Sequence, residues 1–476
     1  MRTQIQVLSE QEKHRVHEST LNVLANTGVR VETSLGRKYL AEAGAQVDDA
    51  TRIVRFPKDF VEQCLQLAPK EFTLGARRPG WDLEMNTGEC VLMIDGSAPT
   101  VLELGQVESR PGKFDDWLKA TRLTDAIDEF GVYWAMVDAS DSGEGMDETV
   151  KYWRHLFGNF SKHIQDGIDD KVAAPWLLEV LQVVFGDKET IRRTHPYSFL
   201  ICPQSPLTID KVYTEAYLAL VGYDIPVAIM PMPLMGGTAP ANMISTTIQG
   251  NCEVISMLCL IQAAAPETPI IYAAALATMD PRTALYGGGR IEDAILGMAC
   301  VEMGKYYGLP VEGSGGGTDH SIPSIQAGYE RGISAVLPIL SWPDLMIGAG
   351  LLGGSMVLSL EQLIIDVEVF RMSKHVARGI DTSEDAWLDD VIAKVGPGGH
   401  YLEEDSTIAF MRGGEYYHPQ IGHHGIFDSW LERGQPDLLD EAHERVQTLL
   451  AEHTPLPLSP EADRELKIIA QKADDA

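Results

Sequence analysis

Basic residues are scarce in this sequence: 38 lysines and arginines stand against 69 aspartates and glutamates, which gives a formal charge of −31. Nucleic acids and anionic membrane surfaces are both recognised through a positively charged footprint. No basic cluster interrupts the acidic pattern, so the composition argues against nucleic-acid and membrane partners. Acidity of this kind also serves solubility and does not by itself identify a ligand.

Cysteine is also scarce, with six residues and no CxxC pair. Most cysteines stand in apolar stretches such as SMLCLIQ and GMACVEM, as is typical of buried free thiols in a reducing compartment. The polar N-terminus has no signal-peptide pattern, and no apolar run is expected to span a bilayer. The sequence therefore predicts a cytoplasmic protein.

Several catalytic motifs are missing. The chain has no GxxxxGK[ST] phosphate loop, no GxSxG elbow and no HExxH pair. A zinc site built from the tail histidines His400, His418, His423 and His424 is an alternative. The adjacent His423 and His424 cannot easily face one ion, and no cysteine lies near them. No tightly bound metal is expected.

The 476 residues are too many for one simple core. Short apolar segments recur, each followed by a helical pattern, which predicts a parallel sheet covered on both faces. Eight such units within about 250 residues match a (β/α)8 barrel. A doubly wound sheet is the competing fold, but no glycine fingerprint follows the first strand. The expected strands are 91–95, 132–138, 162–167, 197–202, 227–232, 270–276, 309–315 and 344–350.

Three parts follow from this pattern. Residues 1–90 form an N-terminal helical and mixed extension. Residues 91–380 form the (β/α)8 catalytic barrel. Residues 381–476 form a C-terminal cap and helices packed on the barrel, and the last two helices are amphipathic enough to contact another subunit.

Active sites of such barrels lie at the carboxyl ends of the strands. The aromatic residues expected there are Trp134, Tyr272, Tyr286 and Tyr329, and aromatic faces bind quaternary ammonium groups by cation–π attraction. Each of these rings has an alternative role as an ordinary core residue. Asp95, at the end of the first strand, is either a site residue or a helix cap.

The stretch GSGGGTDHSIPSIQAGYE, at 313–330, combines a bare backbone with an acid and an imidazole. Asp319 and His320 are candidate catalytic residues, together with Glu312 on the preceding strand. The alternative for Asp319 is a helix N-cap. The backbone at Gly315, Gly316 and Gly317 would either cradle a carboxylate with its amides or let a flat cofactor approach closely.

The same stretch resembles a signature of the MttB-type trimethylamine methyltransferase family. CPQSPLTID, MPMPLMGGTAPANMISTTIQGNCEVI, the 270–310 segment, LSLEQLIIDVEVFRMSKHVARGI and GPGGHYL also resemble family segments, in order. The similarity runs from about residue 10 to the end. One departure is the turn Thr318-Asp319-His320-Ser321, where family members often read TDSK.

The resemblance implies a barrel that moves a methyl group from an amine to the cobalt of a corrinoid carried by a small partner protein. Because the chain contains only standard residues, it resembles the non-pyrrolysine branch, which implies a quaternary amine such as glycine betaine. Trp134, Tyr272, Tyr286 and Tyr329 would hold the cation, and Gly315–Gly317 would admit the corrin (a cobalamin-type ring). The resemblance also suggests a homo-oligomer.

Other functions stay open. A sulfonium or tertiary amine donor would need nearly the same site. A protein that binds a quaternary amine without transferring its methyl group would keep the aromatic residues. A glycoside hydrolase using Glu312 and Asp319 as paired carboxylates is less consistent with the few polar side chains at the strand ends.

Overall fold

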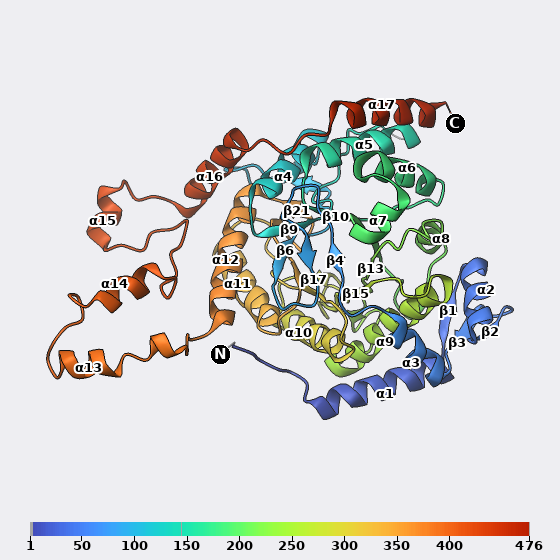
Figure 1. The fold of residues 1–476 in the computed structure, drawn as a ribbon, viewed down its shortest axis with the longest axis horizontal. Coiled ribbons are helices and arrows are strands. Elements are labelled where there is room, and N and C mark those ends of the chain that lie inside the picture. The colour runs from blue at the N-terminus through green and yellow to red at the C-terminus, as the bar shows by residue number, and fades with distance from the viewer. Residues whose placement is uncertain (1–2, 144, 476) are drawn as a thin grey trace.

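A ring of eight parallel strands lies at the centre of the computed structural model, which describes residues 3–143 and 145–475 (Figure 1). The strands pair in the order β15-β13-β11-β10-β9-β6-β19-β18, and a parallel bridge between Tyr272 and Val311 joins the two ends. All eight predicted strands are present, so the (β/α)8 barrel is confirmed. Their bounds are β6 (Val91–Met93), β9 (Phe130–Tyr133), β10 (His163–Asp166), β11 (Tyr197–Ile201), β13 (Val227–Ile229), β15 (Ile270–Tyr272), β18 (Glu312–Ser314) and β19 (Leu345–Ile347).

The strands are apolar on both faces because both faces are covered. On β11 every residue is buried. Leu200 packs in the barrel interior, whereas Phe199 and Ile201 belong to the core shared with the helices. Leu74 and Met85 of the N-terminal extension join the interior cluster and close the amino end of the barrel.

Helices surround the ring (Figure 1). They are α4 (Phe114–Ala126), α5 (Met146–Asn159), α6 (Ala173–Phe185), α7 (Lys188–Thr194), α8 (Val212–Leu218), α9 (Met243–Ala264), α10 (Ile291–Tyr306), α11 (Ile325–Ile339) and α12 (Leu360–Arg378). Contrary to expectation, α9 is long and apolar enough, by length and composition, to cross a membrane. In the fold, 78% of its most apolar window is buried among other elements.

The N-terminal extension is tied to the barrel. Its helices α1, α2 and α3 all pack on α9, and β1 pairs with β12 in the loop after β11. Helix α1 starts at a capping box in which Ser9 and Glu12 bond each other's backbone amides. The bounds are α1 (Glu10–Asn26), β1 (Val29–Val31), α2 (Ser34–Ala43), β2 (Gln46–Asp48), β3 (Ile53–Arg55), α3 (Lys58–Leu67), β4 (Thr73–Leu74), β5 (Leu83–Glu84) and β12 (Thr208–Ile209).

Two small sheets stand in the loops at the carboxyl end of the barrel. One has the order β20-β21-β7-β8 and the other the order β14-β16-β17. The sequence did not predict them, because each strand has only two or three residues. They are β7 (Thr100–Val101), β8 (Arg110–Pro111), β14 (Leu234–Met235), β16 (Ala277–Met279), β17 (Tyr286–Gly287), β20 (Leu351–Leu352) and β21 (Val357–Leu358).

The C-terminal part packs on the barrel through its last two helices. Helix α16 packs on α12 and α4, and α17 packs on α5 and α6. The segment between α12 and α16, which carries η1 and α13–α15, extends away from the barrel (Figure 1). Its side chains Trp387 and Leu402 are therefore exposed. The elements are η1 (Glu384–Ala386), α13 (Asp389–Val395), α14 (Asp405–Arg412), α15 (Phe427–Glu432), α16 (Leu438–Glu452) and α17 (Pro460–Asp474).

Candidate active site

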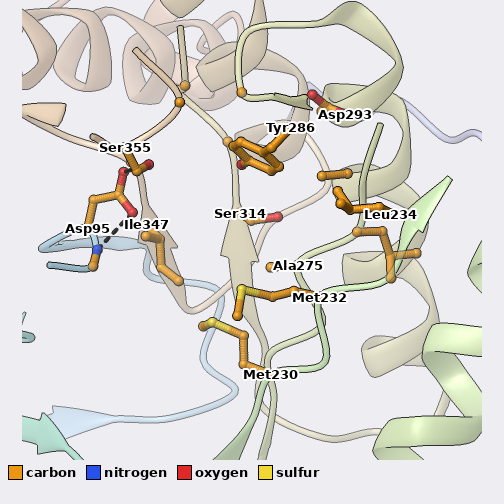
Figure 2. A pocket seen from close by; sticks show the side chains of 18 of the residues that line it. Asp95, Met230, Met232, Leu234, Ala275, Tyr286, Asp293, Ser314, Ile347 and Ser355 are labelled. Carbon is orange, nitrogen blue, oxygen red and sulfur yellow. Dashed lines mark hydrogen bonds between the residues drawn. The ribbon is translucent and has the colours of Figure 1, made fainter. Parts of the chain in front are cut away.

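A cavity of about 410 Å³ lies at the carboxyl ends of the barrel strands (Figure 2). This is the end at which (β/α)8 enzymes build their active sites, and small-molecule sites commonly measure about 300–1,000 Å³. Its walls are Asp95, Gly96, Ser97, Trp134, Met230, Met232, Leu234, Ala275, Leu276, Ala277, Tyr286, Gly288, Asp293, Ser314, Gly315, Gly317, Ile347, Gly348, Gly354 and Ser355.

The lower wall of the cavity in Figure 2 is soft and apolar. Met230 and Met232 follow β13, and their thioethers lie near Ala275 and Ile347 (Figure 2). Met230 is fully buried, whereas half of Met232 is exposed. Methionine is flexible and polarisable, so this wall can adapt to the shape of a methylated ligand.

Two of the four predicted aromatic residues line the cavity: Trp134, which follows β9, and Tyr286 on β17. A Cβ added to Gly96 would lie 2.8 Å from the Trp134 ring, and one added to Gly354 would lie 3.1 Å from the Tyr286 ring. Both rings therefore rest against bare backbone. Tyr286 is 49% exposed, so its ring is accessible from the mouth.

Asp95 brings a carboxylate to the cavity from the end of β6. It accepts hydrogen bonds from the backbone amide of Gly96 at 2.8 Å and from the Ser355 hydroxyl at 3.1 Å (Figure 2). Burial raises the pKa of Asp95, although both hydrogen bonds and the charge of Arg331 oppose that shift. Asp95 therefore lines the cavity. This position agrees with the site role, one of the two roles that the sequence suggested for this residue, the other being a helix cap.

Asp293 brings a second carboxylate from the first turn of α10, on the side of Tyr286 (Figure 2). Burial raises the pKa of Asp293 to about 7, against a smaller opposite effect of Thr278. A nearby cation favours the ionised form of a buried carboxyl group, so such a group and a bound cation stabilise each other. The sequence analysis missed this residue, because an acid in the first turn of a helix is an ordinary feature.

Glu312 lies inside the barrel, two residues before the cavity residue Ser314 on β18. Its Oε2 accepts a 2.8 Å hydrogen bond from Gln165 Nε2, and burial raises its pKa to about 7. Glu312 is 1% exposed and is not one of the cavity-lining residues. Glu312 therefore does not contact a ligand in this cavity directly, and its catalytic role stays a prediction.

The glycine run is needed for packing of the backbone. A Cβ on Gly317 would lie 1.9 Å from the Gly288 carbonyl oxygen, and one on Gly315 would lie 2.4 Å from the Ser334 carbonyl oxygen. Gly316 has a φ of +67° and is not a lining residue. These contacts explain the glycines without a corrin, whose approach to Gly315 and Gly317 stays a prediction.

Asp319 is bound to a neighbouring loop and does not line the cavity. Its Oδ1 accepts hydrogen bonds from the backbone amides of Gly288 at 2.6 Å and Gly289 at 3.2 Å. Its own amide donates to Glu330 at 3.0 Å. The N-cap of α11 is Ser324, not Asp319. The N-cap role is therefore wrong. The hydrogen bonds hold Asp319 beside the loop that carries Tyr286, and its catalytic role stays a prediction.

His320 is held in the same turn. Its Nδ1 lies 2.9 Å from the Ile322 carbonyl oxygen and 3.1 Å from the Ser324 hydroxyl. The imidazole is not part of the cavity wall, so the structure does not place this predicted catalytic residue at the reacting centre.

Tyr272 and Tyr329, which were expected to hold the cation, are also absent from the cavity lining. Tyr272 points out of the barrel, where its hydroxyl donates a 3.0 Å hydrogen bond to Asn251 on α9. Tyr329 lies on α11 and is 63% exposed. The structure does not bring these two rings to the cavity, because neighbours in sequence on a strand or helix point to different sides.

A second cavity of about 720 Å³ adjoins the first and shares Ser97, Trp134 and Met232 with it. Asp166, at the end of β10, lies in its wall, and burial raises the pKa of Asp166 to about 6. Tyr152 donates a 3.3 Å hydrogen bond to this carboxylate. Trp134 therefore stands between two acidic compartments.

No cluster of three or more metal-ligating side chains occurs among the residues the structure describes. Two of the tail histidines contact backbone carbonyls instead: His418 lies 3.4 Å from the Met411 oxygen and His423 3.3 Å from the Ile426 oxygen.

A closed (β/α)8 barrel with an acidic and aromatic cavity at its carboxyl end has the architecture in which barrel enzymes build their active sites. The chain belongs to the trimethylamine methyltransferase (MTTB) family, whose profile matches residues 1–476. It is thus a member of a methyltransferase family, and the resemblance inferred from the sequence is confirmed.

Individual relatives agree over nearly the whole chain. The trimethylamine methyltransferase MttB of Desulfitobacterium hafniense (strain DSM 10664 / DCB-2) is 28% identical over 98% of this chain and 94% of its own. The glycine betaine methyltransferase of Desulfitobacterium hafniense (strain Y51) is 29% identical over 98% and 97%. The crystal structure of the Methanosarcina barkeri monomethylamine methyltransferase (MtmB) gives a TM-score of 0.49 at 12% identity, covering 98% of this chain and 92% of that chain.

Proposed function

We propose that the protein transfers a methyl group from a quaternary amine to the Co(I) of a corrinoid carried by a partner protein. The corrinoid is the second substrate of this reaction. The observation that carries the proposal is the cavity itself, where Trp134 and Tyr286 offer ring faces and Asp95 and Asp293 offer negative charge. Family membership supports the reaction class.

The proposed reaction needs no acid or base group from the protein. The Co(I) electron pair forms the new cobalt–methyl bond while the C–N bond breaks, and the C–N electrons stay on nitrogen. The amine leaves neutral and needs no proton, and cobalt goes formally from Co(I) to Co(III). Catalysis then consists of holding the N–CH3 bond in line with the acceptor and excluding water.

The residues of the site match these tasks. Trp134 and Tyr286 would hold the ammonium by cation–π attraction, and the carboxylates of Asp95 and Asp293 would add a favourable field. Met230 and Met232 would fit around the methyl groups. The acceptor would approach from the mouth, where Met232 and Tyr286 are about half exposed.

Product analysis tests this proposal. The protein, a reduced corrinoid protein and a methyl-13C-labelled quaternary amine are mixed without oxygen. We expect equal amounts of tertiary amine and methylated corrinoid, with the label on cobalt. Tertiary amine formed without corrinoid, or no product from any quaternary amine, would contradict the proposal. Parallel sulfonium and tertiary amine donors test the alternative methyl donors.

A further inference from the structure

The charge of the cavity walls has one sign. Asp95 and Asp293 are its acidic side chains, and no lysine, arginine or histidine stands among the lining residues that the structure describes. The adjoining cavity repeats this pattern, with Asp138, Asp166 and Asp169 and again no basic side chain among the described residues of its wall. A ligand that reaches through either compartment therefore meets acids and not bases.

Two arginines near the cavity are held by acidic residues outside its wall. Arg290 bonds Asp280 and lies 3.7 Å from Asp319. Arg331, on α11, is 1% exposed, and its Nη1 lies 2.7 Å from Asp366. Its Nε and Nη2 are buried and have no hydrogen-bond partner among the described residues. Neither arginine lines the cavity, so neither offers its guanidinium to a ligand there.

The protein itself also fills the backbone anion site beside the cavity. Successive amides of a glycine loop can cradle an anion, and the amides of Gly288 and Gly289 do so here for Asp319 Oδ1. The amide of Gly354 donates to the Thr318 carbonyl oxygen at 2.9 Å. These donors are therefore not available to a carboxylate on the substrate.

We propose that the substrate is a quaternary ammonium whose other substituents are uncharged, and that the cavity discriminates against betaines. This inference rests on the proposed function and narrows its substrate class. A betaine carboxylate would lose its hydration without gaining a cationic partner, next to the acids Asp95 and Asp293. An uncharged hydroxyl or alkyl substituent is not repelled by these carboxylates. Repulsion of the betaine carboxylate alone can therefore give the specificity.

Binding tests the inference without turnover. Tetramethylammonium, choline and glycine betaine are titrated calorimetrically into the full-length protein at pH 8. We expect tetramethylammonium and choline to bind at least tenfold more tightly than glycine betaine. Equal affinities, tighter binding of glycine betaine, or no detectable binding of either neutral-tailed cation would overturn the inference.

A variant separates specificity from structure. Asp293→Asn should weaken choline binding more than glycine betaine binding, so that the ratio of the two affinities falls at least threefold. A residue with a purely structural role would change both affinities alike and leave the ratio unmoved, which would count against the inference. Asp59→Asn, at an exposed acid of α3 in the N-terminal extension, is the matched control and should change neither affinity.

Turnover with the corrinoid protein distinguishes the two possible failures. Methyl transfer from glycine betaine but not from choline or tetramethylammonium would refute the specificity and keep the proposed reaction. Tight binding of the neutral-tailed cations without transfer from any donor would refute the reaction and support the specificity.

Discussion

Gln165 Nε2 donates a 2.8 Å hydrogen bond to Glu312 Oε2 through the interior of the barrel. The two residues stand on β10 and β18, which lie four strands apart in the ring. The other carboxylate oxygen of Glu312 is buried and has no hydrogen-bond partner among the described residues. The pair belongs to a buried polar network, in which the Ser198 hydroxyl donates to Gln165 Oε1 at 3.1 Å and lies 2.9 Å from His163 Nε2.

Ionisation of the buried Glu312 carboxyl makes the free energy of unfolding depend on pH. Burial raises the pKa of Glu312 to about 7, whereas an unfolded glutamate titrates near pH 4.3. Between these values the folded state holds more protons than the unfolded state, so stability falls as pH rises. We expect the free energy of unfolding to fall by up to about 3 kcal/mol between pH 4 and 8 from this group alone.

Urea unfolding at pH 5 and pH 8 measures this effect. Glu312→Gln keeps an acceptor for Gln165 and removes the charge, so the variant should lose less stability than the wild type over that interval. Asp166, whose pKa is also raised by burial, contributes the same slope to both proteins and cancels in the comparison. An identical pH dependence in the two proteins would contradict the account.

Tyr286 should contribute to binding through its ring and not its hydroxyl. Cation–π contacts contribute about 0.5–2 kcal/mol, which corresponds to about 2- to 30-fold in affinity. We expect Tyr286→Ala to weaken tetramethylammonium binding within that range and Tyr286→Phe to leave it nearly unchanged. Calorimetric titration of the three proteins provides the comparison. Equal losses in both variants would mean that the hydroxyl, and not the ring, makes the contact.

Cation affinity should depend on pH near neutrality. Burial raises the pKa of Asp293 to about 7, and the nearby charge of Asp319 adds to that shift. A cation binds the ionised carboxylate better, so affinity should fall as pH drops below about 7, by at most tenfold per unit. Asp95, also buried with a raised pKa, would add to the same trend. Titrations from pH 5.5 to 8.5 measure it, and a flat profile would exclude the Asp293 carboxylate from binding.

The glycine run gives a test of packing with an internal control. Gly317→Ala would place a Cβ 1.9 Å from the Gly288 carbonyl oxygen, whereas a Cβ at Gly328 on α11 meets nothing within 4 Å. We expect Gly317→Ala to cost at least about 2 kcal/mol of stability and Gly328→Ala to be neutral or stabilising by up to about 1 kcal/mol. Urea unfolding of both variants measures the difference. Tolerance of alanine at 317 would refute the close approach of the two loops.

The barrel could be predicted because its signal is local and repeated. Apolar segments such as 197–202 alternate with helices, and a strand buried on both faces leaves that pattern directly in the sequence. The projecting segment that carries α13–α15 could not be separated from the packed helices α16 and α17. Amphipathic helices have the same pattern whether or not their apolar face is covered.

The site was harder to predict because side-chain direction depends on register. Trp134 and Tyr286 line the cavity, whereas Tyr272 lies on the outer face of β15 and bonds Asn251. Asp293 resembles any acid in a first helical turn, and only its burial against the cavity distinguishes it. Asp319 was singled out by its glycine neighbours, yet its carboxylate holds a loop together.

The absorbance of cobalt tests the central claim most directly. The protein is mixed with a Co(I) corrinoid protein and choline or tetramethylammonium in the absence of oxygen, and the spectrum is followed over time. The account predicts conversion of Co(I) to methyl-Co(III) that requires both the protein and the cation, and that is slower in Trp134→Ala. A Co(I) spectrum that stays unchanged with every quaternary amine, while the same corrinoid accepts methyl groups from a chemical donor, would contradict it.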